Sequence, residues 1–292
     1  EPLGLVLAIM PWNFPFWQAL RCAIPSLLAG NAVALKHASN VAGCALAIEN
    51  VLCRALGEHG PAFTVVLLKG ADANSLIPAA NAVSFTGSTE VGREIAATAG
   101  RHLKKCVLEL GGSDAYVVLK DADLDHAAET CVKSRLINAG QSCISAKRFI
   151  IEEPVYGEFS KKFVARMQRA EIAPLARQDL RDDLHGQVKR TLSQGAELLC
   201  GGTIPSGPGW RYPPTVIGKV RPGMAAFDEE TFGPVAALVS AKDEGEAVSL
   251  ANTGPFGLGA AVFSADAPRA AELAQKQLAA GSCFVNEFVR SD

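Results

Sequence analysis

One cysteine of this chain lies in a setting that suits chemistry. Cys143 ends the stretch G-Q-S-C (residues 140–143), a tight loop of small and polar residues directly after a predicted helix. A thiol attacks only as the thiolate, so a reactive cysteine needs positive charge or a base nearby, and Lys147 and Arg148 follow closely. The pattern indicates a candidate nucleophile, although a small residue buried in a loop fits the local sequence as well.

A carboxylate and an amide are candidates for the groups that would assist such a thiol. Glu109 closes an apolar segment beside two glycines, where a carboxylate is costly without a partner or a task, and it can act as a general base. Asn13 is held in P-W-N-F-P (residues 11–15), and a rigidly placed amide can donate to a developing oxyanion. The ordinary alternatives are a salt-bridged strand end and an Asx turn.

A second set of residues suits a nucleotide. Gly87 and Ser88 follow a predicted strand and begin a helix, where a glycine lets the backbone approach a phosphate and the first N–H groups of the helix face it. Lys36 ends another strand and can bind ribose hydroxyls or a phosphate. The usual G-x-G-x-x-G is missing, and a capped helix and a solvated lysine explain the same residues.

Alternating strands and helices must position these groups. Strand-sized apolar runs alternate with segments of helical period, which predicts βαβ units and a mostly parallel sheet covered by helices on both faces. Strands are expected at residues 4–9, 31–35, 63–68, 82–85, 105–110, 115–119, 146–151, 236–239, 259–263 and 282–285. Helices are expected at residues 17–28, 41–56, 72–79, 89–99, 124–138, 155–167, 246–251 and 268–279, and a Gly/Pro-rich loop at 201–214. A Gly-Gly pair at 111–112 marks a boundary, so we predict two α/β domains, at 1–111 and 112–292.

The composition narrows the class of protein. The chain has 292 residues, 49% of them apolar and 20% charged, with a formal net charge of −2, which allows two domains with cores of their own and excludes a disordered chain. Without a basic block, binding to nucleic acid is not expected, and without an apolar run near 20 residues neither is a membrane span. The eight cysteines form no C-x-x-C pair and have no histidine cluster, so we expect no metal, reduced thiols and a cytoplasmic protein.

Five stretches, taken together and in this order, resemble the aldehyde dehydrogenase superfamily. They are P-W-N-F-P (11–15), F-T-G-S (85–88), E-L-G-G-S (109–113), G-Q-S-C (140–143) and E-E-T-F-G-P (229–234), and the resemblance runs over essentially the whole chain. Residues 104–114 and 146–153 look most like succinate-semialdehyde dehydrogenases. The resemblance implies a Rossmann-like NAD(P)-binding domain at 1–111 and an α/β catalytic domain bearing the nucleophile at 112–292.

The resemblance also implies a role for each candidate catalytic residue. Cys143 matches the nucleophile, Glu109 the general base and Asn13 the side-chain donor of the oxyanion hole. Attack of the thiolate on an aldehyde would give an oxyanion held by the Asn13 amide and the Cys143 backbone N–H. After oxidation, a thioester would be hydrolysed to the acid by water that Glu109 activates. The presence of Glu109 favours hydrolysis over transfer of the acyl group to coenzyme A.

The cofactor that the resemblance implies is NAD or NADP. The matching cofactor-binding positions are Trp12, Lys36, Ser39, Gly87, Ser88, Glu230 and Phe232. Lys36 matches the lysine that holds the adenosine ribose. Gly87 and Ser88 match the turn near the pyrophosphate. Glu230 matches the residue that holds the nicotinamide ribose, with Phe232 packing beside it.

Ser39 bears on the choice between the two cofactors. Members that prefer NAD often carry a glutamate three residues beyond the lysine, where it binds the ribose 2′-hydroxyl. A carboxylate there would repel a 2′-phosphate, whereas Ser39 and the nearby His37 would not. We therefore expect NADP to be accepted as well as NAD.

A semialdehyde substrate would need a basic side chain for its own carboxylate. Arg135 and Lys133 lie on the helix that leads into G-Q-S-C, with Arg135 about two helical turns before the thiol. We keep Arg135 as the candidate substrate residue, beside the alternative that both are solvent-facing charges. The substrate expected is a small aldehyde with a carboxylate, succinate semialdehyde first.

Family members are usually longer than this chain. The opening helices, the first strand of an oligomerisation arm, a later glycine-rich loop and a final strand have no counterpart here, so the sequence looks like the interior of a longer protein. We expect a homodimer or tetramer for a full-length chain and a small aldehyde as its partner, with neither nucleic acid nor membrane. Two alternatives stay open: a broad aliphatic aldehyde dehydrogenase, and a truncated, non-catalytic relative that binds nucleotide.

Overall fold

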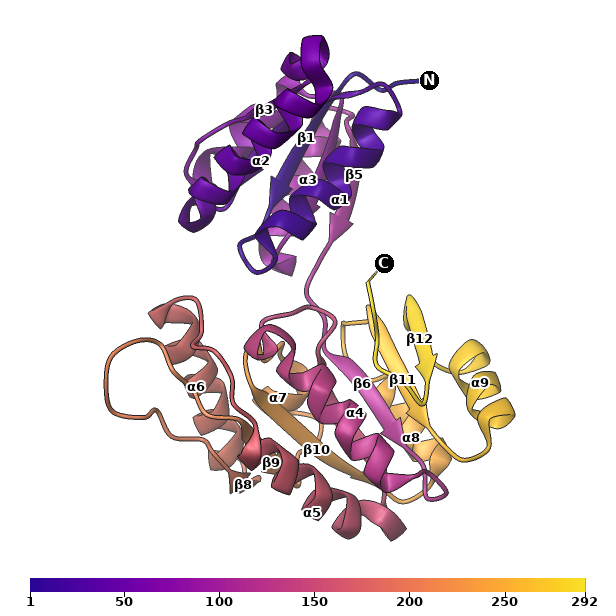
Figure 1. Ribbon diagram of the computed structural model, residues 1–292. Helices are drawn as coiled ribbons and strands as arrows, with labels where there is room; N and C mark the ends of the chain where they lie inside the picture. The colour runs from indigo at the N-terminus through magenta and orange to yellow at the C-terminus, as the bar shows by residue number, and fades with distance from the viewer. Residues whose placement is uncertain (292) are drawn as a thin grey trace. The chain divides into compact units, whose positions relative to one another are not determined.

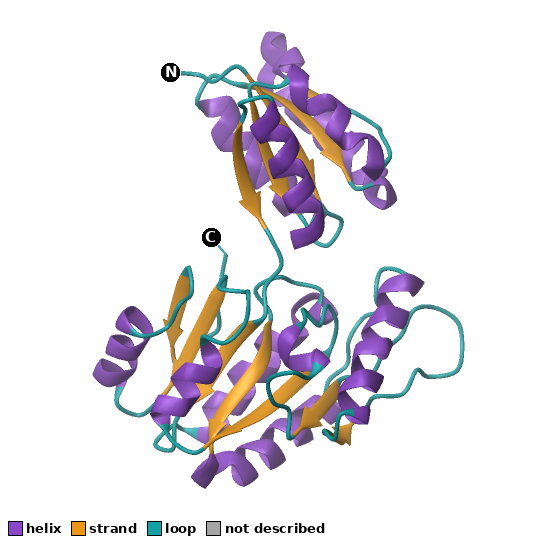
Figure 2. Cartoon of the chain, turned by 180° about the vertical axis from the view of Figure 1, so that it is seen from behind, coloured by secondary structure: helices purple, strands orange, loops and turns teal. Residues whose placement is uncertain are grey.

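The glycine pair at 111–112 separates two α/β units in the computed structural model, which describes residues 1–291. The first unit is Glu1–Gly111, and the second begins at Gly112. Each unit has a central sheet with helices packed against both of its faces (Figures 1 and 2). The predicted α/β class is therefore confirmed.

The first unit contains a five-stranded parallel sheet. Its strands β1 (Leu5–Met10), β2 (Ala32–His37), β3 (Phe63–Val65), β4 (Ala82–Thr86) and β5 (Lys105–Glu109) lie in the order β3-β2-β1-β4-β5. The central strand β1 is a continuous apolar run, as expected for a strand with helices on both sides. Because all five strands run the same way, their carboxyl ends meet at one edge of the sheet.

Helices bury the two faces of this sheet in separate clusters. On one face α1 (Pro15–Leu28) and α2 (Ala42–Leu56) pack their alanines and isoleucine against β1 and β2. On the other, α3 (Thr89–Arg101) and the 3₁₀ segment η3 (Gly70–Ala79) cover β1, β4 and β5. Short 3₁₀ turns η1 (Ser39–Val41) and η2 (Gly57–Ala62) flank α2. The helix expected at 72–79 is thus a 3₁₀ segment, and the strand expected at 63–68 ends at Val65.

The second unit contains a seven-stranded sheet. Its strands are β6 (Asp114–Val118), β7 (Ala146–Glu152), β8 (Glu197–Cys200), β9 (Thr215–Gly218), β10 (Val235–Ala241), β11 (Gly259–Phe263) and β12 (Ser282–Val285). They lie in the order β12-β11-β6-β7-β10-β9-β8, and only the edge pair β8–β9 among the described strands is antiparallel. The sheet is therefore mixed, with parallel strands at its centre.

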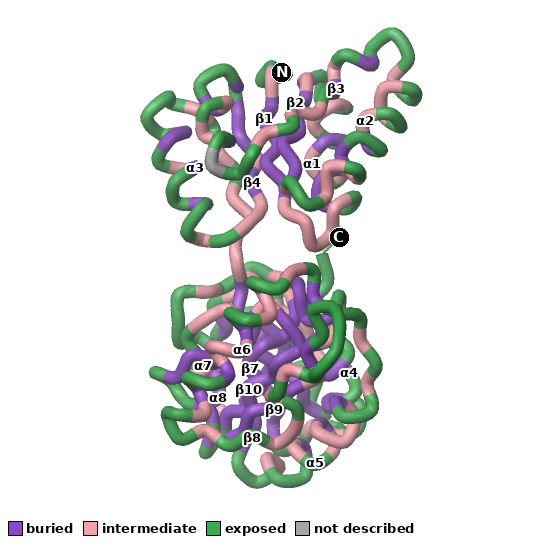
Figure 3. The backbone as a smooth tube through the Cα atoms, turned by 90° about the vertical axis from the view of Figure 1, so that its left-hand side faces the viewer, coloured by how far each residue is buried: buried purple, intermediate pink, exposed green. Residues whose placement is uncertain are grey.

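The helices of the second unit also divide between the two faces of their sheet. Helices α4 (Leu124–Leu136) and α5 (Glu153–Arg169) cover one face with an aromatic-rich cluster. Helices α6 (Gln178–Ser193), α7 (Ala225–Asp228), α8 (Glu244–Ala251) and α9 (Ala267–Lys276) cover the other. Figure 3 shows the resulting interior, in which β7 and β10 are buried along most of their length.

Four elements of this unit were not expected from the sequence. They are α6, α7, β8 and β9. Helix α6 is polar except at Leu180, Leu184, Val188 and Leu192, a four-residue spacing that marks its inner face. Over residues 1–291, no helix is long and apolar enough to cross a membrane, and no three or more His, Cys, Asp or Glu side chains are grouped to hold a metal ion.

Candidate active site

The carboxyl edge of the first sheet gathers the predicted residues of that unit. Trp12 and Asn13 follow β1, Lys36 lies near the end of β2, Ser39 lies just beyond it, Gly87 and Ser88 follow β4, and Glu109 is the last residue of β5. Parallel α/β sheets bind ligands at this edge, where strands end and helices begin. The four strand ends therefore bring together residues that lie up to about a hundred positions apart in the chain.

His37 fixes the loop that carries Asn13. Its Nε2 lies 2.9 Å from the carbonyl of Pro15, and its Nδ1 accepts a hydrogen bond of 3.0 Å from the N–H of Ala38. The same Nδ1 lies 3.2 Å from the carbonyl of Met10, so both ring nitrogens contact backbone groups of this loop and of the strand end before it. The buried imidazole is thus turned into the 11–15 loop, so Ser39 is the exposed member of the pair expected to face a 2′-phosphate.

The turn after β4 has the features of a phosphate-binding helix start. Ser88 is the N-cap of α3, and its hydroxyl accepts from the N–H of Val91 at 3.4 Å. The N–H of Gly87 donates to the carbonyl of Glu109 at 3.0 Å, which ties this turn to the end of β5. Lys36 is buried, and burial lowers the pKa of its ammonium group. A buried cation and a capped helix start at one sheet edge fit a nucleotide with its phosphates and ribose.

Glu109 lies beside a cation that the sequence did not single out. Its Oε1 is 3.5 Å from Nη2 of Arg21 on α1, and each side chain is 37% exposed. Both side chains belong to the first unit, and at this exposure a small molecule can reach them. Nothing in the local sequence around Arg21 marks it, because α1 and β5 meet only in the folded sheet.

The loop before Cys143 has an unusual backbone. Helix α4 ends at Leu136, and Asn138, Ala139 and Gly140 all adopt left-handed φ angles, of 50°, 54° and 77°. Such conformations cost free energy in residues other than glycine and gather at functional sites. At Gly140 a Cβ would collide with the carbonyl of Gly233, so only glycine fits there.

Three of the sequence motifs meet at this loop within the second unit. Gly112 of E-L-G-G-S passes so close to the carbonyl of Cys143 that a Cβ would not fit. Its N–H donates to Oε1 of Glu230 at 3.1 Å. Glu230 and Phe232 lie in the segment between α7 and β10, at the amino end of the β10 strand. The candidate nucleophile and the candidate ribose carboxylate thus share one corner of the unit.

A buried cation, Lys147, supports this corner. Nζ of Lys147 donates to the carbonyls of Ser142, Cys143 and Ser145 at 2.9, 2.9 and 3.0 Å, and it lies 3.7 Å from Oε1 of Glu230. Burial lowers the pKa of Lys147, and the neighbouring charge of Glu230 opposes that effect. Lysine ammonium groups have three donors, so the loop uses all of them.

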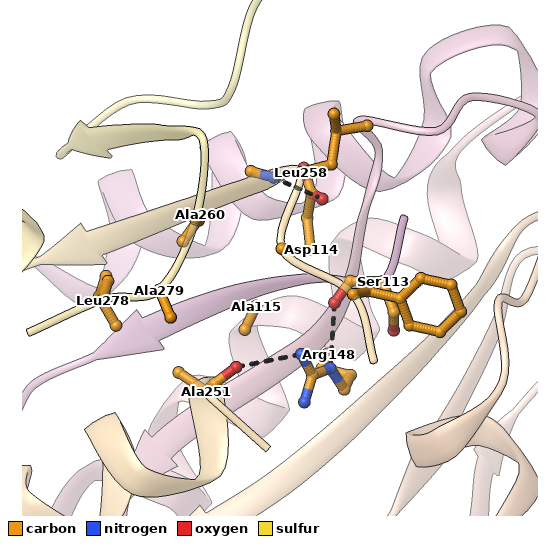
Figure 4. A pocket seen from close by; sticks show the side chains of 13 residues that line it. Ser113, Asp114, Ala115, Arg148, Ala251, Leu258, Ala260, Leu278 and Ala279 are labelled. Carbon is orange, nitrogen blue, oxygen red and sulfur yellow. Dashed lines mark hydrogen bonds between the residues drawn. The ribbon is translucent and has the colours of Figure 1, made fainter. Parts of the chain in front are cut away.

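Arg148 serves the scaffold and not the thiol. Its Nε donates to Ser113 at 3.0 Å, and its Nη atoms donate to the carbonyls of Leu250, Ala251 and Thr253. Figure 4 shows this guanidinium between the start of β6 and α8, with Asp114 nearby accepting from the N–H of Gly259. The two basic residues after G-Q-S-C therefore have different tasks.

Arg135 is placed differently from the expectation for a substrate residue. Its side chain is 0% exposed, and Nη2 donates to the carbonyl of Gly140 at 2.6 Å. Ala127, Cys131 and Arg135 follow one another at four-residue spacing on the buried face of α4. That spacing is the signal that places Arg135 inside, where a substrate carboxylate does not reach it.

The Cys143 thiol is half-buried, and this has an electrostatic cost. Burial raises the pKa of Cys143, and the charge of Lys147 is the main opposing influence. Glu230 and Asp114 act in the same direction as burial. A nucleophilic cysteine in this setting depends on positive charge to form its thiolate.

Comparisons with known proteins identify the family of this chain. Residues 1–292 match the aldehyde dehydrogenase family. The chain is 48% identical over 304 residues to succinate semialdehyde dehydrogenase [NAD(P)+] Sad of Escherichia coli strain K12, covering all of this chain and 65% of that protein. It is 43% identical over 298 residues to succinate-semialdehyde dehydrogenase [NADP(+)] of Mycobacterium avium strain 104, covering 98% of this chain and 63% of that protein.

A solved structure gives the same picture of the fold. Succinic semialdehyde dehydrogenase from Streptococcus pyogenes, in complex with NADP+, superposes with a TM-score of 0.94 at 34% identity, covering 99% of this chain and 66% of that one. The chain belongs to the aldehyde dehydrogenase family. It spans about two-thirds or slightly less of the length of the relatives it matches, 65% for the Escherichia coli protein.

Proposed function

We propose that this protein oxidises an aldehyde to a carboxylic acid with NAD or NADP, and that succinate semialdehyde is its substrate. The observation that carries the proposal is the loop of Cys143, whose strained backbone and buried ammonium present one thiol among glycines. The relatives named as NAD(P)+- and NADP(+)-dependent succinate-semialdehyde dehydrogenases support the substrate and the cofactor.

The chain's own residues supply the steps around the aldehyde. The Cys143 thiolate attacks the carbonyl carbon, and the Asn13 amide with the Cys143 N–H stabilises the oxyanion. A nicotinamide cofactor, once bound, would supply the two-electron oxidation that converts this adduct to the thioester. Glu109 then takes a proton from water, which attacks the thioester and releases the acid and the thiolate.

The residues at the first sheet edge would hold the cofactor. The buried ammonium of Lys36 and the exposed hydroxyl of Ser39 would take the adenosine ribose, and Gly87 and Ser88 the pyrophosphate. On the other unit Glu230, with Phe232 beside it, would take the nicotinamide ribose. Ser39 brings no negative charge against a 2′-phosphate, which supports use of NADP as well as NAD.

For the substrate carboxylate we infer Arg21 in place of Arg135. A thioester can be hydrolysed by Glu109 only if the substrate lies against this carboxylate, and Arg21 is 3.5 Å away with an exposed guanidinium. A guanidinium there binds a second carboxylate well because of its forked donors. Arg135 is fully buried, and its Nη2 donates to the carbonyl of Gly140.

We also propose a cellular location and an oligomeric state for this protein. The eight cysteines are free in the part of the chain that the structure describes, which suits a reducing compartment and supports a cytoplasmic location. For the complete protein we propose a homodimer or tetramer.

The experiment follows NADH and NADPH formation with succinate semialdehyde and with a neutral aldehyde of equal length. It compares the wild-type chain with Cys143→Ala, both shown to be folded by circular dichroism. We expect turnover in the wild type, a loss of about a thousandfold or more in the variant, and preference for the semialdehyde. A folded wild-type chain without turnover would contradict the proposal. Equal rates with the two aldehydes would instead indicate a broad aliphatic aldehyde dehydrogenase.

A further inference from the structure

Lys147 is a buried cation that occupies the inside of the nucleophile loop. We propose that Lys147 is a positioning residue that holds the Cys143 loop and provides the fixed positive charge that makes its thiolate accessible at neutral pH. This deepens the proposed function, because it rests on Cys143 as the nucleophile. The inference joins three observations: the contacts of the ammonium, its burial, and the charges around it.

The contacts show that the ammonium is bound to the loop and to little else. Its hydrogen bonds go to the carbonyls of Ser142, Cys143 and Ser145, at 2.9 to 3.0 Å. Two of these carbonyls belong to the candidate nucleophile and the residue before it. Movement of the loop would leave donors of a buried ammonium without partners, which costs free energy. Lys147 therefore holds the backbone on both sides of the thiol.

Burial strengthens the electrostatic effect of the Lys147 charge on the groups close to it. The side chain of Lys147 is 0% exposed, so water does not screen it as it would a surface lysine. Because lysine has a compact charge on a flexible stem, it can be placed where a forked guanidinium would not fit. Burial lowers the pKa of this ammonium, and the negative charge of Glu230 is the main influence that favours its charged form.

The surrounding charges explain why a cation is needed at this position. Cys143 faces Lys147, Glu230 and Asp114, and the two carboxylates disfavour a third negative charge. Lys147 in turn faces Glu230, Arg135, Asp114 and Cys143. Glu230 lies 3.7 Å from the ammonium and also accepts from Gly112. Removal of the Lys147 charge and removal of the Glu230 charge should therefore shift the pKa of the Cys143 thiol in opposite directions.

The experiment measures alkylation of Cys143 by iodoacetamide between pH 6 and 10, without aldehyde or cofactor. The peptide that contains Cys143 is quantified by mass spectrometry, since seven other cysteines are present. Lys147→Met removes the charge and the donors, and Lys147→Gln removes the charge but keeps an amide donor. We expect both variants to react about tenfold or more slowly at pH 7.5, with the midpoint of the profile raised by about one pH unit or more. Glu230→Gln should lower the midpoint.

Controls separate the charge of Lys147 from its effect on stability. Lys219→Met removes an exposed lysine that pairs with Glu197, and its profile should match the wild type. Circular dichroism and thermal unfolding establish which variants fold. If Lys147→Met does not fold, the alkylation profile of Lys147→Gln is the test. A folded Lys147→Gln with the wild-type midpoint would overturn the proposal. Alkylation requires no turnover, so this result is distinct from a failure of the wild type to oxidise aldehydes.

Discussion

The two units place their candidate residues at opposite ends of parallel strands. In the first unit Asn13, Lys36 and Glu109 follow or end strands, at the carboxyl edge of the sheet. In the second, Cys143 and Glu230 precede β7 and β10, at the amino ends of those strands. The first edge offers the half-buried Asn13 and Glu109 beside the buried Lys36, whereas the second offers a loop held by the buried charge of Lys147.

This difference indicates that the two edges are suited to different tasks, the binding of a ligand and the positioning of a nucleophile. A ligand with phosphates and hydroxyls is bound by helix N-termini and accessible side chains, which the carboxyl edge of a parallel sheet supplies without strain. A nucleophile must be held in one position, and the second unit does this with left-handed residues, close glycine contacts and the ammonium of Lys147. We therefore expect substitutions in the two units to change different properties of the protein.

The largest difference is expected from Glu109→Gln in the first unit. This variant keeps the shape but removes the base, so turnover should fall by about a hundredfold to ten-thousandfold. Mixing with aldehyde should still give one equivalent of reduced cofactor per active chain, measured in a stopped-flow instrument, because only hydrolysis is blocked. Glu90→Gln, an exposed change in the same unit, is the control and should retain turnover. A variant of Glu109 that turns over at the wild-type rate would show that another group is the base.

Asp114 in the second unit should affect stability and its dependence on pH. Burial raises the pKa of Asp114 from 3.8 to about 6, although Lys147 and Arg148 oppose the rise. The folded state thus prefers the protonated form, so the stability it contributes is full below about pH 4 and is lost as the pH rises through 6. Asp114→Asn mimics that form and should be more stable than the wild type by roughly 3 kcal/mol at pH 7.5, with little difference at pH 4.

Urea unfolding at pH 4, 5, 6 and 7.5 tests this expectation. The matched control is Asp121→Asn, because hydrogen bonds from Ser264 and the N–H of Asp266 lower the pKa of Asp121. Its contribution to stability has the opposite sign: it is present at neutral pH and is lost as the pH falls. A constant difference between Asp114→Asn and the wild type at all four values would show that Asp114 is not protonated in the folded protein near pH 5.

Ser39→Glu should produce the smallest of these changes and should leave the fold intact. Ser39 is exposed, so a carboxylate there meets solvent in the free protein and a 2′-phosphate in the complex. We expect the ratio of kcat/KM with NADP to that with NAD to fall by about tenfold, because like charges repel. Asn40→Glu puts the same charge one residue further on and should change the ratio less. An unchanged ratio in Ser39→Glu would place the 2′-phosphate elsewhere.

Much of the fold could be predicted from the sequence because buried parallel strands are continuous apolar runs. Strand β11 and strand β12 have the expected ends, and β1, β2 and β4 differ by one or two residues. Helix α6 was missed because its apolar residues are few and widely spaced among charged ones. The edge strand β8 is short and half-exposed, so its sequence resembles a loop.

The site was only partly predictable, for a physical reason. The ends of strands and the start of helices follow from local patterns, so Glu109, Ser88 and the loop of Cys143 could be found. Which way a charged side chain turns depends on its tertiary neighbours, so the enclosure of Arg135 and the contacts of His37 were not anticipated. Arg135 did carry a signal in its four-residue spacing from Cys131, but its charge argued against burial.

The strand order of the first unit has a consequence for how this protein is made. Among the five strands of this unit, β1 is synthesised before the others yet lies at the centre of the sheet, and its partners β2 and β4 begin at residues 32 and 82. The nascent chain therefore carries an unsatisfied hydrophobic strand for many residues, which is a hazard for aggregation and a reason to need chaperones. β5 is added last, so the carboxylate of Glu109 reaches its place only when the whole unit has been synthesised.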